Sequence, residues 1–458
     1  MSLTRQDPEL EREIEDVSQL ADFFRGGETA REDFRVGTEH EKIGLYEQTL
    51  SPVPYEGDRG IGALLAVLHR EYGFDPLEDG ERLVGLEREG ASITLEPGGQ
   101  LELSGAPLVT LHDTCREFNE HLALMKHVSE RFGIAWLGLG IHPLAKLDEL
   151  PRMPRERYAL MRSFLSERGA LALWMMHGTG TVQANFDFSS EADAARKLRL
   201  ALAASPIITS LYANSGVSEG GPNGFESRRA WVWRHTDPDR CGLLPFAFSD
   251  EWLEGGAYDR YARWALDVPG LFIVRDDHHL PLEGRTFRDY LENGHAGERA
   301  TLADWNVHLT TLFPEARMKR VIEVRGADAV PPSLVCALPA FWKGLFYDDA
   351  SLDAAFERVR SWTWREVDAL HAAVAREGLA AASPGGPVLE VARELVDLSA
   401  AGLARIAAPN RRGETEELFL EPLYEILDRG ASPARAVLEL WEGAWAGRID
   451  RLIEYAKY

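Results

Sequence analysis

The segment VGTEHEKIGLY (36–46) carries two glutamates at alternate positions of a predicted strand. With a period of two, Glu39 and Glu41 point to one face of the strand, and His40 and Lys42 point to the other. Two neighbouring carboxylates on one strand face repel each other. The pattern therefore fits either a solvated surface or a site that holds a cation.

Three further segments have the same alternation of an apolar and a polar face. SITLEPGGQLELSG (92–105) predicts a hairpin, while TVQANFDF (181–188) and RMKRVIEVR (317–325) predict strands. Their polar faces carry Glu96, Gln100, Glu102, Gln183, Asn185, Arg317, Lys319, Glu323 and Arg325. For any one strand, a sheet with one face in water explains the pattern. Because glutamates gather here with few lysines, we predict instead that these strands share one sheet, with an acidic trough beside an arginine and lysine wall.

The residue types of this predicted face indicate a particular chemistry. Carboxylate oxygens suit Mg²⁺, which is usually held by a few carboxylates together with water and substrate phosphates. Arginine and lysine side chains would bind phosphate or carboxylate oxygens. The glycine-rich segment 213–233 predicts a loop that covers the substrate and ends in a tryptophan-rich strand. We expect this loop to bring Asn214, Ser215, Asn223 and Arg229 to the substrate.

Several other site types find no support in the sequence. It contains no P-loop, HExxH or GxSxG motif, and GLGIHP (138–143) is half of a dinucleotide fingerprint without its helix. Cys115, Cys241 and Cys336 are far apart and form no CxxC pair. We expect Cys115 and Cys336 to be core residues, and we expect neither a nucleophilic cysteine nor a regulatory disulfide.

The chain of 458 residues has a formal net charge of −24, which disfavours binding to nucleic acid or to an anionic membrane. It has no long apolar run and no apolar stretch near its first residue, so neither a membrane span nor a signal peptide is expected. Together with the cysteine pattern, this predicts a cytoplasmic protein. A mixed catalytic body is predicted over 1–350, and an alanine-rich helical region packed on that body over 351–458.

Six motifs resemble the plant and proteobacterial type of glutamate–cysteine ligase: GTEHEKIGLY, ITLEPGGQLELSGAP, TVQANFDFSSEAD, the ANS and PNGF segments of the loop, LTTLFPEARMKRVIEVRGAD and CALPAFWKGLFYD. The resemblance implies an α+β fold related to glutamine synthetase, with a curved, mainly antiparallel sheet that binds ATP and substrates on its concave face. It implies the following site residues: metal ligands Glu39, Glu41, Glu96, Glu102 and Glu323; phosphate-facing cations Arg317, Lys319 and Arg325; nucleotide contact Gln100; and substrate contacts Arg229, Gln183, Asn185, Tyr158 and Arg162.

The resemblance also implies a reaction, the first step of glutathione synthesis. Glutamate would react with ATP to give γ-glutamyl phosphate, cysteine would displace the phosphate, and two or three Mg²⁺ ions would assist. Small molecules would be the only ligands, and the chain would be a monomer or a weak homodimer. Two alternatives stay open: a carboxylate–amine ligase with another amine acceptor, and a non-catalytic relative that binds glutamate or nucleotide.

Overall fold

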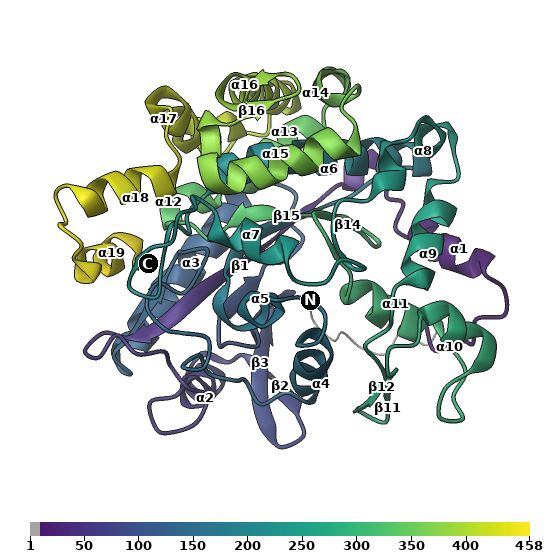
Figure 1. The fold of residues 1–458 in the computed structure, drawn as a ribbon, viewed down its shortest axis with the longest axis horizontal. Helices are drawn as coiled ribbons and strands as arrows, with labels where there is room; N and C mark the ends of the chain where they lie inside the picture. Colours follow the sequence, from purple (N-terminus) through teal and green to yellow (C-terminus); the bar gives the residue numbers. More distant parts are fainter. Residues whose placement is uncertain (1–9) are drawn as a thin grey trace.

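The computed structural model describes residues 10–458. Their strands form a nine-stranded sheet in the order β14-β15-β7-β1-β5-β4-β3-β2, with β6 paired to β1, and every strand pair in it is antiparallel. Helices surround this sheet, and the helices after residue 349 gather along one side of it (Figure 1). The expected α+β class, with its antiparallel sheet and helical C-terminal region, is confirmed.

The elements have the following bounds. The strands of the large sheet are β1 (Val36–Tyr46), β2 (Asp75–Asp79), β3 (Arg82–Arg88), β4 (Ala91–Leu95), β5 (Leu101–Ser104), β6 (Ile134–Leu137), β7 (Thr181–Phe186), β14 (Ala316–Met318) and β15 (Ile322–Asp328). Shorter strand pairs are β8 (Val217–Ser218) with β9 (Gly221–Pro222), β10 (Cys241–Gly242) with β13 (Phe313–Pro314), β11 (Phe272–Arg275) with β12 (His278–Pro281), and β16 (Ala382–Ser383) with β17 (Gly386–Pro387).

The helices before residue 348 are α1 (Ser18–Arg25), α2 (Ile61–Tyr72), α3 (Leu111–Glu130), α4 (Glu156–Leu165), α5 (Ala172–Gly178), α6 (Glu191–Tyr212), α7 (Arg228–Arg234), α8 (Asp250–Glu254), α9 (Ala257–Asp267), α10 (Phe287–Asn293), α11 (Leu302–Thr310), α12 (Pro332–Val335) and α13 (Ala337–Phe346). The later helices are α14 (Asp349–Val359), α15 (Trp364–Glu377), α16 (Val388–Ile406), α17 (Glu421–Arg429), α18 (Pro433–Glu442) and α19 (Ile449–Ala456). Short 3₁₀ helices are η1 (Arg31–Asp33), η2 (Pro245–Phe248), η3 (Gly378–Ala380) and η4 (Glu416–Leu420).

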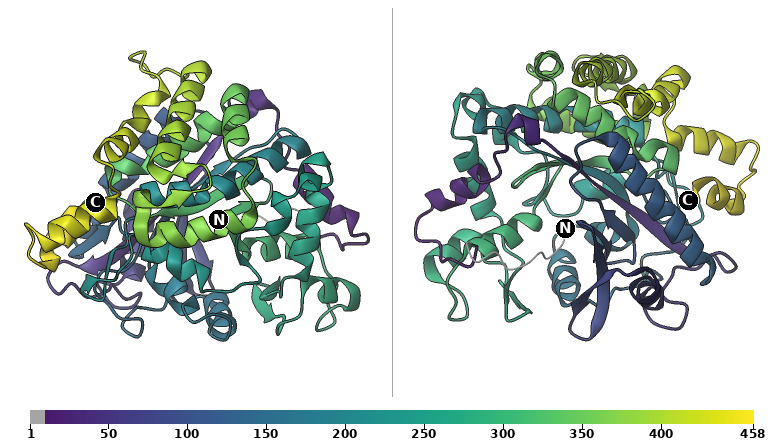
Figure 2. Two further views of the ribbon diagram at one scale, coloured as in Figure 1. Left: turned by 45° about the horizontal axis from the view of Figure 1, so that its top comes forward. Right: turned by 180° about the vertical axis from the view of Figure 1, so that it is seen from behind.

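The two faces of β1 have different surroundings, as its alternation predicts. His40 and Lys42 are fully buried on the face covered by α3, where the His40 ring packs edge-on against Phe118. Seen from behind, α3 lies across the sheet beside β1 (Figure 2, right). The opposite face of β1 carries Glu39 and Glu41, so one strand separates a buried basic layer from the acidic one.

The predicted strand segments form as expected, with two differences. The 92–105 segment makes the β4–β5 hairpin, and 181–186 makes β7. Residues 317–325 form the β14–β15 hairpin and not one continuous strand. The tryptophan-rich segment after the loop, predicted as a strand, is the helix α7, whose N-cap Ser227 accepts a hydrogen bond from the Ala230 amide.

The largest apolar core contains residues from both parts of the chain. It includes Leu211 of α6, Leu345 of α13 and Leu370 of α15. The division at residue 350 stays a proposal, and the shared core supports close packing of the two parts. In the described chain, no helix has the length and the apolar character that a membrane crossing requires.

The structure pairs Cys115 with Cys336, which was not expected from the sequence. Both lie in apolar surroundings, but α3 brings Cys115 next to the start of α13, where the two form a disulfide with a Cα–Cα distance of 5.9 Å. The two positions are 221 residues apart in sequence, so no local pattern predicts the pairing. Cys241 is a free thiol.

We expect Cys336→Ser to lower the free energy of unfolding by about 2–5 kcal/mol under oxidising conditions, because the bond closes a very long loop and restricts the unfolded chain. Denaturant unfolding with and without a reducing agent measures this. The reducing agent should abolish the difference between the variant and the unmodified protein. Cys241→Ser is the control, and a loss of stability equal to that of Cys336→Ser would contradict the assignment.

His142, in the GLGIHP segment, has a structural role. Its Nδ1 accepts hydrogen bonds from the amides of Leu144 (3.2 Å) and Ala145 (2.9 Å), which requires an unprotonated nitrogen. Burial lowers the pKa of His142 to about 4. In the unfolded chain the pKa is near 6.5, so His142 stabilises the fold fully above pH 6.5, and this contribution is lost as the pH falls towards 4.

We therefore expect the free energy of unfolding to fall by about 3 kcal/mol through His142 between pH 6.5 and 4. His142→Asn, which keeps an acceptor oxygen but does not titrate, should make this pH dependence shallower. Unfolding in urea at several pH values measures the slope. An identical slope in the variant would show that His142 does not titrate in this way.

Candidate active site

The predicted row of carboxylates exists on one face of the sheet. Glu41 of β1 lies directly opposite Glu102 of β5, and Glu39 lies directly opposite Gln183 of β7. Directly opposed residues of antiparallel strands point to the same face. Asn185, two residues along β7, donates a hydrogen bond from Nδ2 to Glu39 Oε1 (3.0 Å). Sequence alternation therefore predicted this face correctly.

Burial and neighbouring carboxylates disfavour the ionised form of the glutamates in this row when no cation is bound. Burial, together with the charges of Glu323 and Glu102, raises the pKa of Glu39. Burial, Glu96 and Glu102 raise the pKa of Glu41 well above its usual value. Such shifts arise where like charges share a desolvated site. A bound cation would offset both the burial of these carboxylates and the repulsion between them, which agrees with the predicted metal site.

Beside this row, Glu323 is surrounded by the three predicted cations. Arg317, directly opposite on β14, donates from Nη2 to both carboxylate oxygens (2.9 and 2.7 Å), Lys319 Nζ lies 3.3 Å from Oε2, and Arg325 also forms an ion pair with Glu323. Arg325 Nη1 also donates to Gln183 Oε1 (2.8 Å). Burial would raise the pKa of Glu323, but its cationic neighbours outweigh burial and hold it well below the usual value.

The predicted metal ligands do not converge on one point in the described part of the chain. Within residues 10–458, no three acidic, histidine or cysteine side chains come together as a group that could hold a metal ion. Glu323, in particular, has both oxygens in ion pairs with Arg317 and Arg325. A metal would therefore have to draw the carboxylates together, and Glu323 would have to exchange partners.

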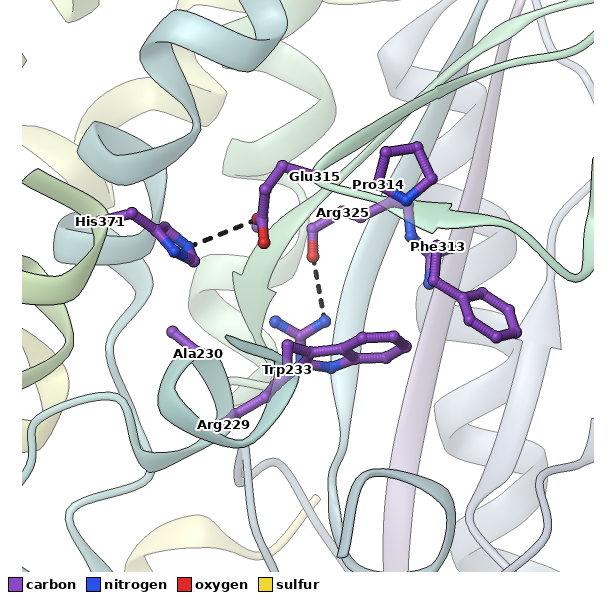
Figure 3. Close-up of a pocket in the computed structure, with 9 residues that line it drawn as sticks. Arg229, Ala230, Trp233, Phe313, Pro314, Glu315, Arg325 and His371 are labelled. Atoms are coloured by element: carbon purple, nitrogen blue, oxygen red, sulfur yellow. Dashed lines mark hydrogen bonds and ion pairs between the residues drawn. The ribbon is translucent and has the colours of Figure 1, made fainter. Parts of the chain in front are cut away.

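A small pocket lies at the end of this face, between α7, β15 and α15 (Figure 3). Arg229 donates from Nη2 to the carbonyl oxygen of Arg325 (3.0 Å), and its guanidinium lies over the Trp233 ring. Arg229 Nε and Trp233 Nε1 are buried donors without a hydrogen-bond partner among the described residues. Buried donors of this kind are normally paired, so the pocket fits an anionic ligand.

The opposite wall of this pocket carries Glu315 and His371, which sequence reasoning did not identify. Glu315 follows β13, and His371 comes from α15 in the C-terminal region. The only signal in the sequence was the position of Glu315 two residues before Arg317. No pattern within either segment could have linked Glu315 to His371, which lies 56 positions later in the sequence.

Three of the predicted contacts make hydrogen bonds to backbone groups. Gln100 donates from Nε2 to the Thr179 carbonyl (2.7 Å) and accepts from the Gly98 amide (2.9 Å), so it fixes the β4–β5 turn. Asn214 Nδ2 donates to two backbone carbonyls (2.8 and 2.9 Å), and Asn223 Nδ2 donates to the Ser215 carbonyl (2.9 Å). These amides hold the hairpin and the loop in shape, and their contacts with a ligand stay predictions.

Tyr158 and Arg162 of α4 line a separate cavity of about 1020 Å³ beside the β4–β5 turn. Tyr158 donates from its hydroxyl to the Leu95 carbonyl (2.5 Å), and Arg162 Nη1 donates to His177 Nε2 (2.7 Å). Arg152 and Arg155 line the same cavity. The sequence signal for these two was the arginine-rich run that starts at residue 152.

The fold and the carboxylate-lined face together define a ligase. The glutamate–cysteine ligase of Francisella tularensis, solved in complex with AMP, has the same fold, with a TM-score of 0.57 at 12% identity over 93% of this chain and 89% of that chain. The chloroplastic glutamate–cysteine ligases of Solanum lycopersicum and Arabidopsis thaliana are each 42% identical over 96% of this chain and 82% of their own length. The model of glutamate-cysteine ligase family 2 (GCS2) matches residues 35–455. The chain belongs to that family.

These comparisons confirm the family resemblance and the ligase class predicted from the sequence. They contradict the predicted cytoplasmic location, because the curated relatives at about 42% identity are chloroplastic enzymes. The cytoplasmic prediction came from scattered cysteines and from the residues at the start of the sequence. The argument from the scattered cysteines also fails on the structure, because Cys115 and Cys336 form a disulfide.

Proposed function

We propose that this chain joins the γ-carboxylate of glutamate to the amine of cysteine with ATP as co-substrate, in the first step of glutathione synthesis. One observation carries the proposal. In a member of the glutamate–cysteine ligase family, a row of carboxylates and a cluster of arginine and lysine side chains share one sheet face. The pocket at Arg229 includes Arg325 of that face, and its buried donors without partners among the described residues support a carboxylate substrate there.

In the first half of the reaction, a γ-carboxylate oxygen of glutamate attacks the terminal phosphorus of ATP. The bond from that phosphorus to the ADP oxygen breaks, and the products are γ-glutamyl phosphate and ADP. Both reactants are anions, so the reaction needs cations that are already positioned. Arg317, Lys319 and Arg325 would exchange Glu323 for phosphate oxygens.

The carboxylates suit Mg²⁺, since they are hard oxygen donors, and burial with like charges raises the pKa of both Glu39 and Glu41. Glu39, Glu41, Glu96, Glu102 and Glu323 would hold two or three such ions. Bound Mg²⁺ would neutralise the charge of the triphosphate. Glu323 would become available to a metal ion once Arg317, Lys319 and Arg325 bind phosphate oxygens of ATP instead.

In the second half of the reaction, the neutral amine of cysteine attacks the acyl carbon of γ-glutamyl phosphate. The bond from that carbon to the phosphate oxygen breaks, phosphate leaves, and the amide nitrogen loses a proton to solvent. Arg229 would bind the α-carboxylate of glutamate. The cavity lined by Tyr158 and Arg162 lies beside Glu96 and would admit a further substrate.

Transfer of ¹⁸O from labelled glutamate tests the acyl-phosphate step. With [γ-¹⁸O]glutamate, ATP, Mg²⁺ and cysteine, each phosphate released should carry one ¹⁸O atom, because a γ-carboxylate oxygen leaves with it. Labelled glutamate without cysteine is the control for exchange that does not belong to turnover. Unlabelled phosphate formed together with the dipeptide would contradict the proposed intermediate.

A further inference from the structure

The pocket at Arg229 contains a carboxylate, Glu315, that the proposed metal and phosphate sites do not use. Ser205 Oγ donates to Glu315 Oε2 (3.0 Å), and His371 Nε2 lies 3.5 Å from the same oxygen. Among residues 10–458, the Ser205 hydrogen bond and the His371 contact both fall on Oε2, and no hydrogen bond reaches Oε1. The side chain is 10% exposed, at the wall of the pocket (Figure 3). One oxygen is thus fixed by the protein, and the other is available to a ligand.

Glu315 is anionic in the folded chain. Burial would raise its pKa, but His371 and Arg229 outweigh burial and hold the pKa at about 2. The wall around Arg229 has the opposite character: Arg229 Nη1 lies 4.0 Å from Asp328, while Arg229 Nε and Trp233 Nε1 are donors without a partner among the described residues. A single small pocket therefore offers an acceptor on one side and cationic or neutral donors on the other.

An α-amino acid has the matching pair of groups, an ammonium and a carboxylate on one carbon. We infer that Glu315 Oε1 accepts hydrogen bonds from the α-ammonium of the glutamate substrate while Arg229 binds its α-carboxylate. The γ-carboxylate then extends towards the acidic face of the sheet. This inference rests on the proposed function and adds a recognition residue to it.

The chemistry of the second half-reaction assigns Glu315 to the glutamate and not to the cysteine. The amine that attacks γ-glutamyl phosphate must be unprotonated. A carboxylate next to an amine stabilises the protonated form and raises the pKa of that amine. Glu315 would thus suppress the nucleophile if it bound the acceptor, whereas the amine of the donor stays charged throughout the reaction.

His371 is the positioning residue of this arrangement. It stands on α15, where its Nδ1 is 3.4 Å from Arg234 Nη1, and Arg234 forms an ion pair with Asp368 of the same helix (2.7 Å). Through the 3.5 Å contact between His371 Nε2 and Glu315 Oε2, the C-terminal helical region lies against Glu315. This region therefore completes the donor pocket from outside the large sheet.

Glutamate and glutarate, which lacks the α-amino group, test the inference when they are compared on Glu315→Gln and on the unmodified enzyme. Affinity is measured from the KM of glutamate, from competitive inhibition by glutarate, and from the rise in unfolding temperature that each causes. The unmodified enzyme should prefer glutamate by about 10- to 100-fold, the range expected for a hydrogen bond to a charged group. Glu315→Gln should lose most of this preference, with the affinity for glutarate and the KM for ATP unchanged within about twofold.

Glu357→Gln is the matched control, because it removes an exposed carboxylate whose partner is Arg360 on the surface. It should keep the full preference for glutamate. A preference that is unchanged in Glu315→Gln would overturn the inference while the proposed function stands, whereas no ligation of glutamate by the unmodified enzyme would overturn both. If Glu315→Gln does not fold, Glu315→Asp is measured in its place, because it shortens the side chain by one methylene. An unchanged preference for glutamate in Glu315→Asp would likewise overturn the inference.

Discussion

Glu41→Gln is expected to lower the rate of ATP-dependent ligation by about 10³-fold or more, because it removes a charged ligand from the proposed Mg²⁺ site. The same change should raise the free energy of unfolding without Mg²⁺. The pKa of Glu41 is raised in the folded chain, so its contribution to stability is present below pH 4.5 and is lost as the pH rises towards the folded pKa. At neutral pH the carboxylate destabilises the fold, and glutamine removes that cost.

Two measurements on one preparation check this prediction. The first is the initial rate at saturating substrates, and the second is the unfolding temperature with and without Mg²⁺. Mg²⁺ should stabilise the unmodified protein more than Glu41→Gln, since only the former has the full set of carboxylates. A variant that is both inactive and less stable without Mg²⁺ would indicate a structural role for Glu41 and contradict the metal assignment.

Glu323→Gln is expected to abolish turnover as well, but with the opposite effect on stability. Glu323 is fully buried and neutralises Arg317, Lys319 and Arg325. Removing the anion that pairs with all three leaves these cations close together, with only the charges of Glu39 and Glu41 to offset them. Breaking a buried ion pair from one side costs about 3–5 kcal/mol, and we expect a loss in that range.

Denaturant unfolding of Glu323→Gln in parallel with Glu41→Gln measures the contrast. Addition of an ATP analogue should recover part of the lost stability in Glu323→Gln, because phosphate oxygens would replace the missing carboxylate. Equal stability of Glu323→Gln and the unmodified protein, without any ligand, would contradict the role of Glu323 as the counter-ion of the cluster.

The polar face was predictable because strand alternation is a local property. Glu39, Glu41 and Glu102 each point to the face that their sequence position predicts, and antiparallel pairing then brings them together. Arg317 and Glu323 were predicted to share a face because both were placed at alternate positions of one continuous strand. A hairpin, and not a single strand, places them opposite each other.

The remaining site features depend on contacts between distant segments. Cys115 and Cys336 pair because α3 packs near the start of α13, which no spacing within either segment reveals. Asn214 was expected at the substrate because amides suit polar ligands, yet its Nδ2 is used by backbone carbonyls of two other segments. Glu315 and His371 meet only because α15 packs against α7 beside the sheet.

The central claim is that this face of the sheet couples glutamate to cysteine with ATP. Phosphate release by the purified protein, with glutamate, ATP and Mg²⁺ and each amino acid in turn as acceptor, tests it most directly. We predict that cysteine gives release together with an equal amount of γ-glutamylcysteine, and that removal of Mg²⁺ stops it. Release that depends on another amine and not on cysteine, or ATP binding without turnover for any acceptor, would contradict the claim.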